Sequence, residues 1–168
     1  MRCRFTGWAL ALALVGAPSG VWAHGSEYVY ARLILGPQPR LELSLEYEDN
    51  PVVDSPEQAR RILERELLLG FGGRISDLAG LAPRAVWGEV KVFPQSAPVP
   101  VPSPGEGIDH RLLTVTIDVA CPFQLSLKAG SEQAVIYWVD EPGPERPEAP
   151  SRWKILLAGD TAPVVDGP

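Results

Sequence analysis

The chain has 168 residues and a formal net charge of −6 at pH 7, because 21 aspartates and glutamates outnumber 15 lysines and arginines. Nucleic acids and anionic membrane surfaces attract clustered basic residues, so this acidic balance argues against both as partners. With 45% hydrophobic residues, the chain has the length and composition of one domain with a core of its own.

The first 23 residues have the pattern of a secretory signal. Arg2 and Arg4 precede an apolar run over residues 8–17, and Val21 and Ala23 stand where a signal peptidase reads the chain. The run is far shorter than the roughly 20 residues that a membrane-spanning helix needs. The sequence therefore predicts cleavage after Ala23, a periplasmic or secreted mature protein, and no membrane anchor after cleavage.

Cleavage would also change the charge and the cysteine content. It removes two basic residues and no acidic one, so the formal net charge changes from −6 to −8. Cys3 leaves with the signal, and Cys121 then lacks a partner for an intramolecular disulfide. An oxidising compartment favours disulfides wherever two thiols can meet. We therefore expect Cys121 to be buried, with a disulfide to another chain as the alternative.

Two strands are predicted after this junction, over residues 27–35 and 41–47. The first is rich in aromatic and β-branched residues, and the second alternates strictly between apolar and polar residues. The alternation predicts that one face of the second strand contacts the core through Leu41, Leu43, Leu45 and Tyr47. Its polar residues Glu42, Ser44 and Glu46 are expected to face water.

One amphipathic helix of about four turns is predicted next. Ser55 suits the N-cap, Pro56 the first helical position and Gln58 the capping box. Apolar residues recur at helical spacing as far as Phe71, and Gly70 suits the C-terminal end. Residues 70–74 are interpreted as a flexible exit turn rather than a phosphate-binding loop, because such a loop precedes its helix.

The remaining chain predicts further strands separated by proline-rich loops. A strand over residues 85–93 leads into an extended loop over 94–109. Strands are then expected over 113–119, 123–127, 134–139 and 153–157, with a second proline-rich loop over 141–151. The strand over 134–139 is apolar on both faces, which predicts a central position in a sheet. Residues 159–168 have no pattern and are expected to form a poorly ordered tail.

This profile predicts a mainly β fold in a single domain over residues 24–158. About seven strands and one helix favour an antiparallel, immunoglobulin-like β-sandwich with one inserted α-helix. The Cys…Trp…Cys pattern of immunoglobulin domains is absent, so the prediction depends on the strand count. An α+β sheet with the helix on one face is the alternative.

Sequence motifs of enzymes are missing from the chain. It has no G-x-S-x-G, H-E-x-x-H, C-x-x-C or P-loop motif, and the mature protein would hold two histidines, His24 and His110. No pair of carboxylates can be singled out as general acid and base. We therefore expect a protein that is not an enzyme.

One metal site can be proposed, at the N-terminus that cleavage creates. His24 would offer its α-amino group and its imidazole to one ion, and His110 would supply a third nitrogen. Asp109 and Glu27 are the nearby carboxylates that could act as a fourth ligand. Three nitrogens and an oxygen suit Cu(II) in tetragonal geometry, so copper is the cofactor that this set favours.

These residues resemble the site of the periplasmic copper-carrier proteins of bacteria, which are immunoglobulin-like and bind Cu(II) through a terminal histidine and an Asp-x-His pair. The resemblance covers His24, Asp109, His110 and the expected architecture, and it implies a Cu(II) carrier. The chain departs from the pattern, because Asp109 and His110 are adjacent. Adjacent strand residues point to opposite faces, so both could bind one ion only from the loop before the strand. The inserted helix is a second departure.

The leading functional hypothesis is a small exported accessory or binding domain with a protein partner and no cofactor. Trp87 and Trp153 are candidate anchors for that partner, because indole rings bind strongly at interfaces. Aromatic residues in strands are also common cross-strand neighbours, which is the structural alternative for both. Cu(II) binding through His24 and His110 is the alternative function.

Overall fold

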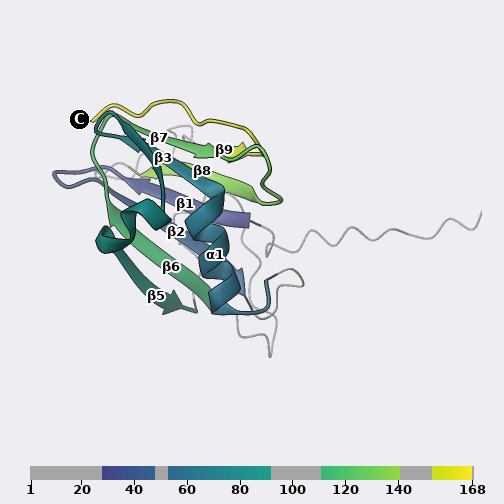
Figure 1. Ribbon diagram of the computed structural model, residues 1–168. Coiled ribbons are helices and arrows are strands. Elements are labelled where there is room, and N and C mark those ends of the chain that lie inside the picture. The colour runs from purple at the N-terminus through teal and green to yellow at the C-terminus, as the bar shows by residue number, and fades with distance from the viewer. Residues whose placement is uncertain (1–27, 48–52, 92–110, 141–152, 168) are drawn as a thin grey trace, which may run out of the picture.

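The computed structural model describes residues 28–47, 53–91, 111–140 and 153–167. Its elements are drawn in Figure 1. In chain order they are β1 (Tyr28–Ile34), β2 (Arg40–Tyr47), α1 (Pro56–Glu66), β3 (Leu67–Phe71), β4 (Arg74–Asp77), the 3₁₀ helix η2 (Ala79–Arg84), β5 (Ala85–Val90), β6 (Arg111–Asp118), β7 (Phe123–Leu127), β8 (Ala134–Asp140) and β9 (Trp153–Leu156). The predicted mainly β fold with one α-helix is confirmed. The predicted signal over residues 1–23 and the proline-rich loops over 94–109 and 141–151 lie outside the described residues.

The strands form a larger and a smaller sheet. The larger sheet has the order β5-β6-β2-β1-β8-β9, and all its neighbouring strands are antiparallel except β1 and β8, which run parallel. The smaller sheet has the order β4-β3-β7 and is antiparallel throughout. As predicted for its apolar sequence, β8 is an inner strand. Among the described strands, β5 and β9 are the edges of the larger sheet.

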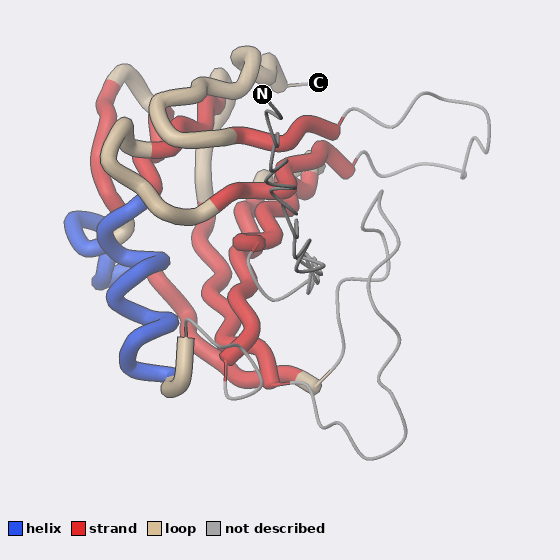
Figure 2. Tube along the Cα trace, turned by 90° about the vertical axis from the view of Figure 1, so that its right-hand side faces the viewer, coloured by secondary structure: helices blue, strands red, loops and turns tan. Residues whose placement is uncertain are grey.

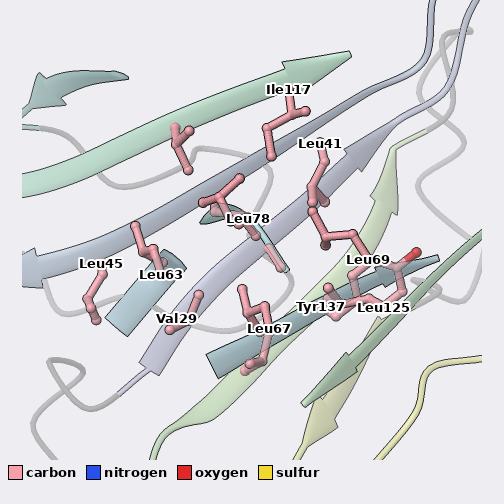
Figure 3. Close-up of a cluster of buried hydrophobic side chains, with 14 of the residues drawn as sticks. Val29, Leu41, Leu45, Leu63, Leu67, Leu69, Leu78, Ile117, Leu125 and Tyr137 are labelled. Atoms are coloured by element: carbon pink, nitrogen blue, oxygen red, sulfur yellow. The ribbon is translucent and has the colours of Figure 1, made fainter. Parts of the chain in front are cut away.

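Helix α1 and the smaller sheet lie on the same side of the larger sheet and cover it together (Figure 2). The core fills the space between these two layers (Figure 3). Leu41, Leu43 and Leu45 of β2 are fully buried there, so the alternation predicted the core face of this strand correctly. Leu63 of α1 and Leu67 of β3 are the opposing side chains from the second layer.

The outer face of the larger sheet differs from the prediction. Ser44 and Glu46 were expected in water, but they are only 5% and 3% exposed. This face has an apolar cluster of its own, formed by Tyr30, Leu112, Ile136 and Trp138 with Tyr28 packed against it. An alternating sequence identifies two faces of a strand, but it does not show that the polar face lies beside aromatic neighbours from other strands.

Helix α1 begins where the sequence predicts and ends earlier. The Ser55 hydroxyl accepts a hydrogen bond from the Gln58 backbone N–H (3.4 Å), and the Gln58 side chain accepts one from the Asp54 N–H (3.3 Å). The helix stops at Glu66, and Leu67 is already in β3, opposite Leu127 of β7. The prediction of four turns was wrong because the apolar run after Glu66 gains a complete ladder of strand partners in β7.

The glycine pair Gly72-Gly73 closes a β-hairpin between β3 and β4. Both residues have positive φ, 58° and 71°, and Phe71 pairs with Arg74 across the turn. Positive φ at both central positions is the requirement of a tight hairpin turn whose twist matches the strands. The interpretation of residues 70–74 as a helix exit was therefore wrong, and the sequence pattern did not predict strand β4.

The C-terminal segment, residues 158–167, runs along β7 instead of forming the poorly ordered tail that was expected. Val165 exchanges two backbone hydrogen bonds with Phe123 (2.8 and 2.9 Å), and the Ala162 N–H donates to the Leu125 carbonyl (2.8 Å). Ala162 is 1% exposed and belongs to the core. The segment extends the smaller sheet beyond β7 without the regular period of a strand. No local sequence pattern therefore predicts its position.

Candidate functional site

The candidate site is a pocket of about 420 Å³ between the β8–β9 edge of the larger sheet and the C-terminal segment. We call it the C-terminal pocket. It is lined by Tyr137, Val139, Trp153, Lys154, Pro163, Val164, Val165 and Asp166. Its volume lies in the range of small-ligand and side-chain pockets. Most of the lining is apolar, and Lys154 and Asp166 add one charge of each sign.

One wall of this pocket depends on how the C-terminal segment docks on β7. The Gln124 side-chain amide donates to the Ala162 carbonyl (3.1 Å), and the Leu127 N–H donates to the Asp160 carbonyl (2.9 Å). Asp160 also closes the preceding turn, because its carboxylate accepts from the Leu157 N–H (2.9 Å). These bonds fix the segment before Pro163, and the bond pair of Val165 with Phe123 fixes it beyond Pro163, so the wall is held in place.

Tyr137 of β8 lies at the base of the pocket. It reaches from the larger sheet towards Leu125 in the core and is 2% exposed (Figure 3). Its hydroxyl oxygen is buried and has no hydrogen-bond partner among the residues that the structure describes. Burial, and then the nearby Cys121 thiol, raise the pKa of the phenol well above its ordinary value. The side chain is therefore a neutral donor and acceptor whose capacity is unused.

Cys121 lies near this phenol and is half-buried rather than fully buried. Burial raises the pKa of its thiol, and the charge of Asp166 raises it further. A Cβ added at Gly167 would come within 3.1 Å of the Cys121 Cβ, so the end of the C-terminal segment passes directly over it. A protonated thiol under a covering segment is a poor nucleophile and a poor metal ligand.

The pocket adjoins the unpaired edge of β9. This strand pairs with β8 on one side, and none of the other described strands pairs with its second side. Its outward side chains are accessible, with Trp153 37% and Ile155 45% exposed, and Leu157 beyond the strand is 58% exposed. A strand paired on one side leaves alternate backbone N–H and C=O groups free for another chain.

The two predicted tryptophan anchors have different environments. Trp153 is exposed beside the pocket and lies opposite Trp138 across the β8–β9 pair. Trp87 is only half-exposed, and the Arg60 guanidinium of α1 covers its ring at 4.6 Å from the centroid. Trp87 packs against the core from β5. It is therefore better described as a packing residue of the fold than as an anchor for a partner.

The four predicted metal ligands, His24, Glu27, Asp109 and His110, all lie outside the described residues. Within 28–47, 53–91, 111–140 and 153–167, no group of three or more His, Cys, Asp and Glu side chains could hold a metal ion. No sequence motif singles out Tyr137. Its only signal is a tyrosine in a strand that is apolar on both faces, where a buried hydroxyl must find a distant partner.

Comparisons with protein-family models, with curated proteins and with solved structures found no match to this chain. No helix in the described part of the chain is long and apolar enough to span a membrane.

Proposed function

We propose that this protein is a non-catalytic, exported binding domain that captures an extended segment of a partner protein at β9 and the C-terminal pocket. The observation that carries the proposal is Tyr137, which lines that pocket and whose buried hydroxyl has no hydrogen-bond partner among the described residues. Leaving such a group without a partner costs about 1–3 kcal/mol, which a ligand group that bonds to it would recover.

The edge of β9 that pairs with none of the described strands supports an extended partner rather than a helical one. A segment that pairs with β9 gains main-chain hydrogen bonds without needing a particular sequence. Its side chains then alternate, one facing inward over the C-terminal pocket and the next facing outward beside Trp153. Lys154 faces inward with Tyr137, its register partner, so the inward position has both an apolar wall and polar groups.

Specificity would come from the side chain that enters the pocket. Val139 and Val165 favour an apolar stem, and the Tyr137 hydroxyl favours a polar group at its end. A glutamine side chain has this composition, with two methylenes followed by an amide. The partner segment is therefore expected to carry such a residue between outward-facing apolar ones.

The signal-like N-terminal sequence supports export, and the state of Cys121 supports a non-catalytic role. A thiol whose pKa is raised by burial is held as the neutral form, which does not attack substrates. Because Tyr137 is likewise held neutral, neither of these two groups is an activated nucleophile.

The test compares two capped hexapeptides of alternating valine and threonine that differ only in a central glutamine or leucine. Binding to the mature protein and to a Tyr137→Phe variant is measured by NMR titration. Tyr137→Phe should lower the affinity for the glutamine peptide about fivefold or more, which is the equivalent of one hydrogen bond. The affinity for the leucine peptide should change little. Val86→Ala, on the opposite edge strand and 70% exposed, is the matched control and should leave both affinities unchanged.

If Tyr137→Phe changed the affinity for the two peptides equally, the hydroxyl would not be part of the binding site. Failure of both peptides to bind would overturn strand capture by this edge.

A further inference from the structure

A second pocket, of about 390 Å³, lies at the opposite edge of the smaller sheet, between the β3–β4 hairpin and η2. We call it the arginine pocket. It is lined by two arginines, Arg74 of β4 and Arg84 of η2, above an apolar surface that includes Leu69, Phe71 and Leu81. We propose that this pocket binds an organic anion that has an apolar body and a carboxylate or phosphate group.

The two guanidinium groups are not neutralised within the described structure. Neither Arg74 nor Arg84 forms an ion pair with a described residue, although the chain as a whole is acidic. Both side chains are exposed, so an anion can reach them from solvent. A guanidinium presents a planar fork of donors that matches the geometry of carboxylate and phosphate oxygens.

The neighbouring carboxylate, Asp77, is already engaged elsewhere. Its Oδ1 accepts a hydrogen bond from the Gly80 N–H (3.0 Å), and its Oδ2 lies 3.6 Å from the Lys128 Nζ. In β4 it lies on the opposite face to Arg74 and Ser76, since its register partner is Leu68. Asp77 therefore fixes the start of η2 without occupying the pocket.

The remaining lining explains why the ligand would need an apolar part. The Ser76 hydroxyl donates to the Asp77 carbonyl (3.0 Å), so the arginines are the side-chain donors left for an anion among the described lining residues. The Phe71 ring stacks with Phe123 (centroids 6.4 Å apart), which gives the base of the pocket a fixed aromatic surface. An inorganic anion would leave this surface in water, whereas an aromatic or aliphatic acid would cover it.

The arginine pocket does not depend on the function proposed for β9. It shares no lining residue with the C-terminal pocket, and its ligand is a small anion rather than a peptide. A molecule bound here would therefore occupy the protein together with a partner segment.

In the experiment, the protein is titrated separately with benzoate, phenyl phosphate, inorganic phosphate and benzyl alcohol, each to about 10 mM. Binding is measured from the NMR shifts of the backbone amides in residues 69–84. Benzoate or phenyl phosphate should bind, and which of them binds more tightly identifies the anionic group. Arg74→Gln and Arg84→Gln should each lower the affinity for that ligand at least fivefold. Added salt should lower the affinity of the unmodified protein for it. Arg61→Gln, on an exposed face of α1, should change nothing.

Binding of benzyl alcohol as tight as that of benzoate would overturn the proposal, because the arginines would then contribute nothing. An equal loss in Arg61→Gln would also overturn it, as would the absence of shifts with every anion. Circular dichroism of each variant checks that the exposed substitutions leave the fold intact.

Discussion

The side-chain amide of Gln124 donates a hydrogen bond of 3.1 Å to the backbone carbonyl of Ala162. On the other side of the same residue, the Ala162 N–H donates to the Leu125 carbonyl (2.8 Å). Ala162 is thus bound to β7 by both of its backbone polar groups, and its side chain lies in the core. The C-terminal segment is a structural part of the smaller sheet, and the C-terminal pocket exists because of it.

Removal of residues 159–168 should therefore destabilise the protein. The truncation exposes the core surface beneath Ala162 and leaves the backbone groups of Phe123 and Leu125 without partners, so we expect the free energy of unfolding to fall by about 2–4 kcal/mol. Urea denaturation measures this change. Val164→Ala is the control, because Val164 is 53% exposed and its loss should change stability by less than about 0.5 kcal/mol. An unchanged midpoint on truncation would contradict the docking of the segment.

Tyr137→Phe should leave the free protein as stable as before or raise its free energy of unfolding by up to about 1 kcal/mol. The substitution removes a buried hydroxyl that has no partner in the described part of the chain and keeps the ring that packs in the core. Urea denaturation of the two proteins in parallel provides the comparison. A loss of more than about 1 kcal/mol would mean that the hydroxyl makes a hydrogen bond within the protein.

Alkaline pH should destabilise the protein in part through Tyr137. Burial raises the folded-state pKa of this phenol well above its ordinary value, so the unfolded state releases the proton first. Stability from this group is complete below about pH 10 and declines as the pH rises towards the folded-state pKa. Burial raises the pKa of Tyr30 in the same direction, so Tyr137→Phe should reduce the decline without abolishing it. Equal slopes in the two proteins between pH 9 and about pH 11 would count against this role.

Cys121 should react slowly with iodoacetamide at about pH 8, because its thiol is held protonated by burial and by Asp166. Mass spectrometry measures the rate in the folded protein and in urea, where the thiol regains its ordinary pKa. Truncation of residues 159–168 removes both the cover of Gly167 and the charge of Asp166, so the rate should rise towards that of the unfolded chain. A folded protein that reacts as fast as the unfolded one would contradict the environment described for Cys121.

The copper hypothesis stays a prediction, since its four ligands lie outside the described residues. It requires a chain that begins at His24, because only a free α-amino group can join the imidazole in a chelate. Cu(II) titration should then show tighter binding to that chain than to its His24→Ala and His110→Ala variants. Equal affinity in all three proteins would exclude the site.

The sequence predicted the features that depend on local chemistry. The alternation in residues 41–47 identified the core face of β2, and the Ser55-Pro56 pair identified the start of α1. It failed where a distant partner decides the outcome. Leu67 fits a helix by spacing and a strand by composition, and the ladder with β7 selects the strand.

The candidate site is harder to predict for the same reason. The docking of the C-terminal segment depends on bonds between residues about 40 positions apart, such as that of Gln124 with Ala162. A sequence also cannot show that a buried hydroxyl lacks a partner, because the absence of a bond depends on every neighbour in space. Trp153 was the accessible part of the site that composition could suggest.

The addition of a partner strand to β9 is tested most directly with the glutamine hexapeptide and two copies of it, each N-methylated at one of the two alternating sets of backbone nitrogens. Strand addition predicts intermolecular NOEs between the peptide backbone and residues 153–156. It also predicts that binding is lost for the copy whose methyl groups lie on the edge that faces β9, because those hydrogen-bond donors are gone. Shifts confined to other parts of the protein, or equal affinity for the methylated peptide in either register, would contradict it.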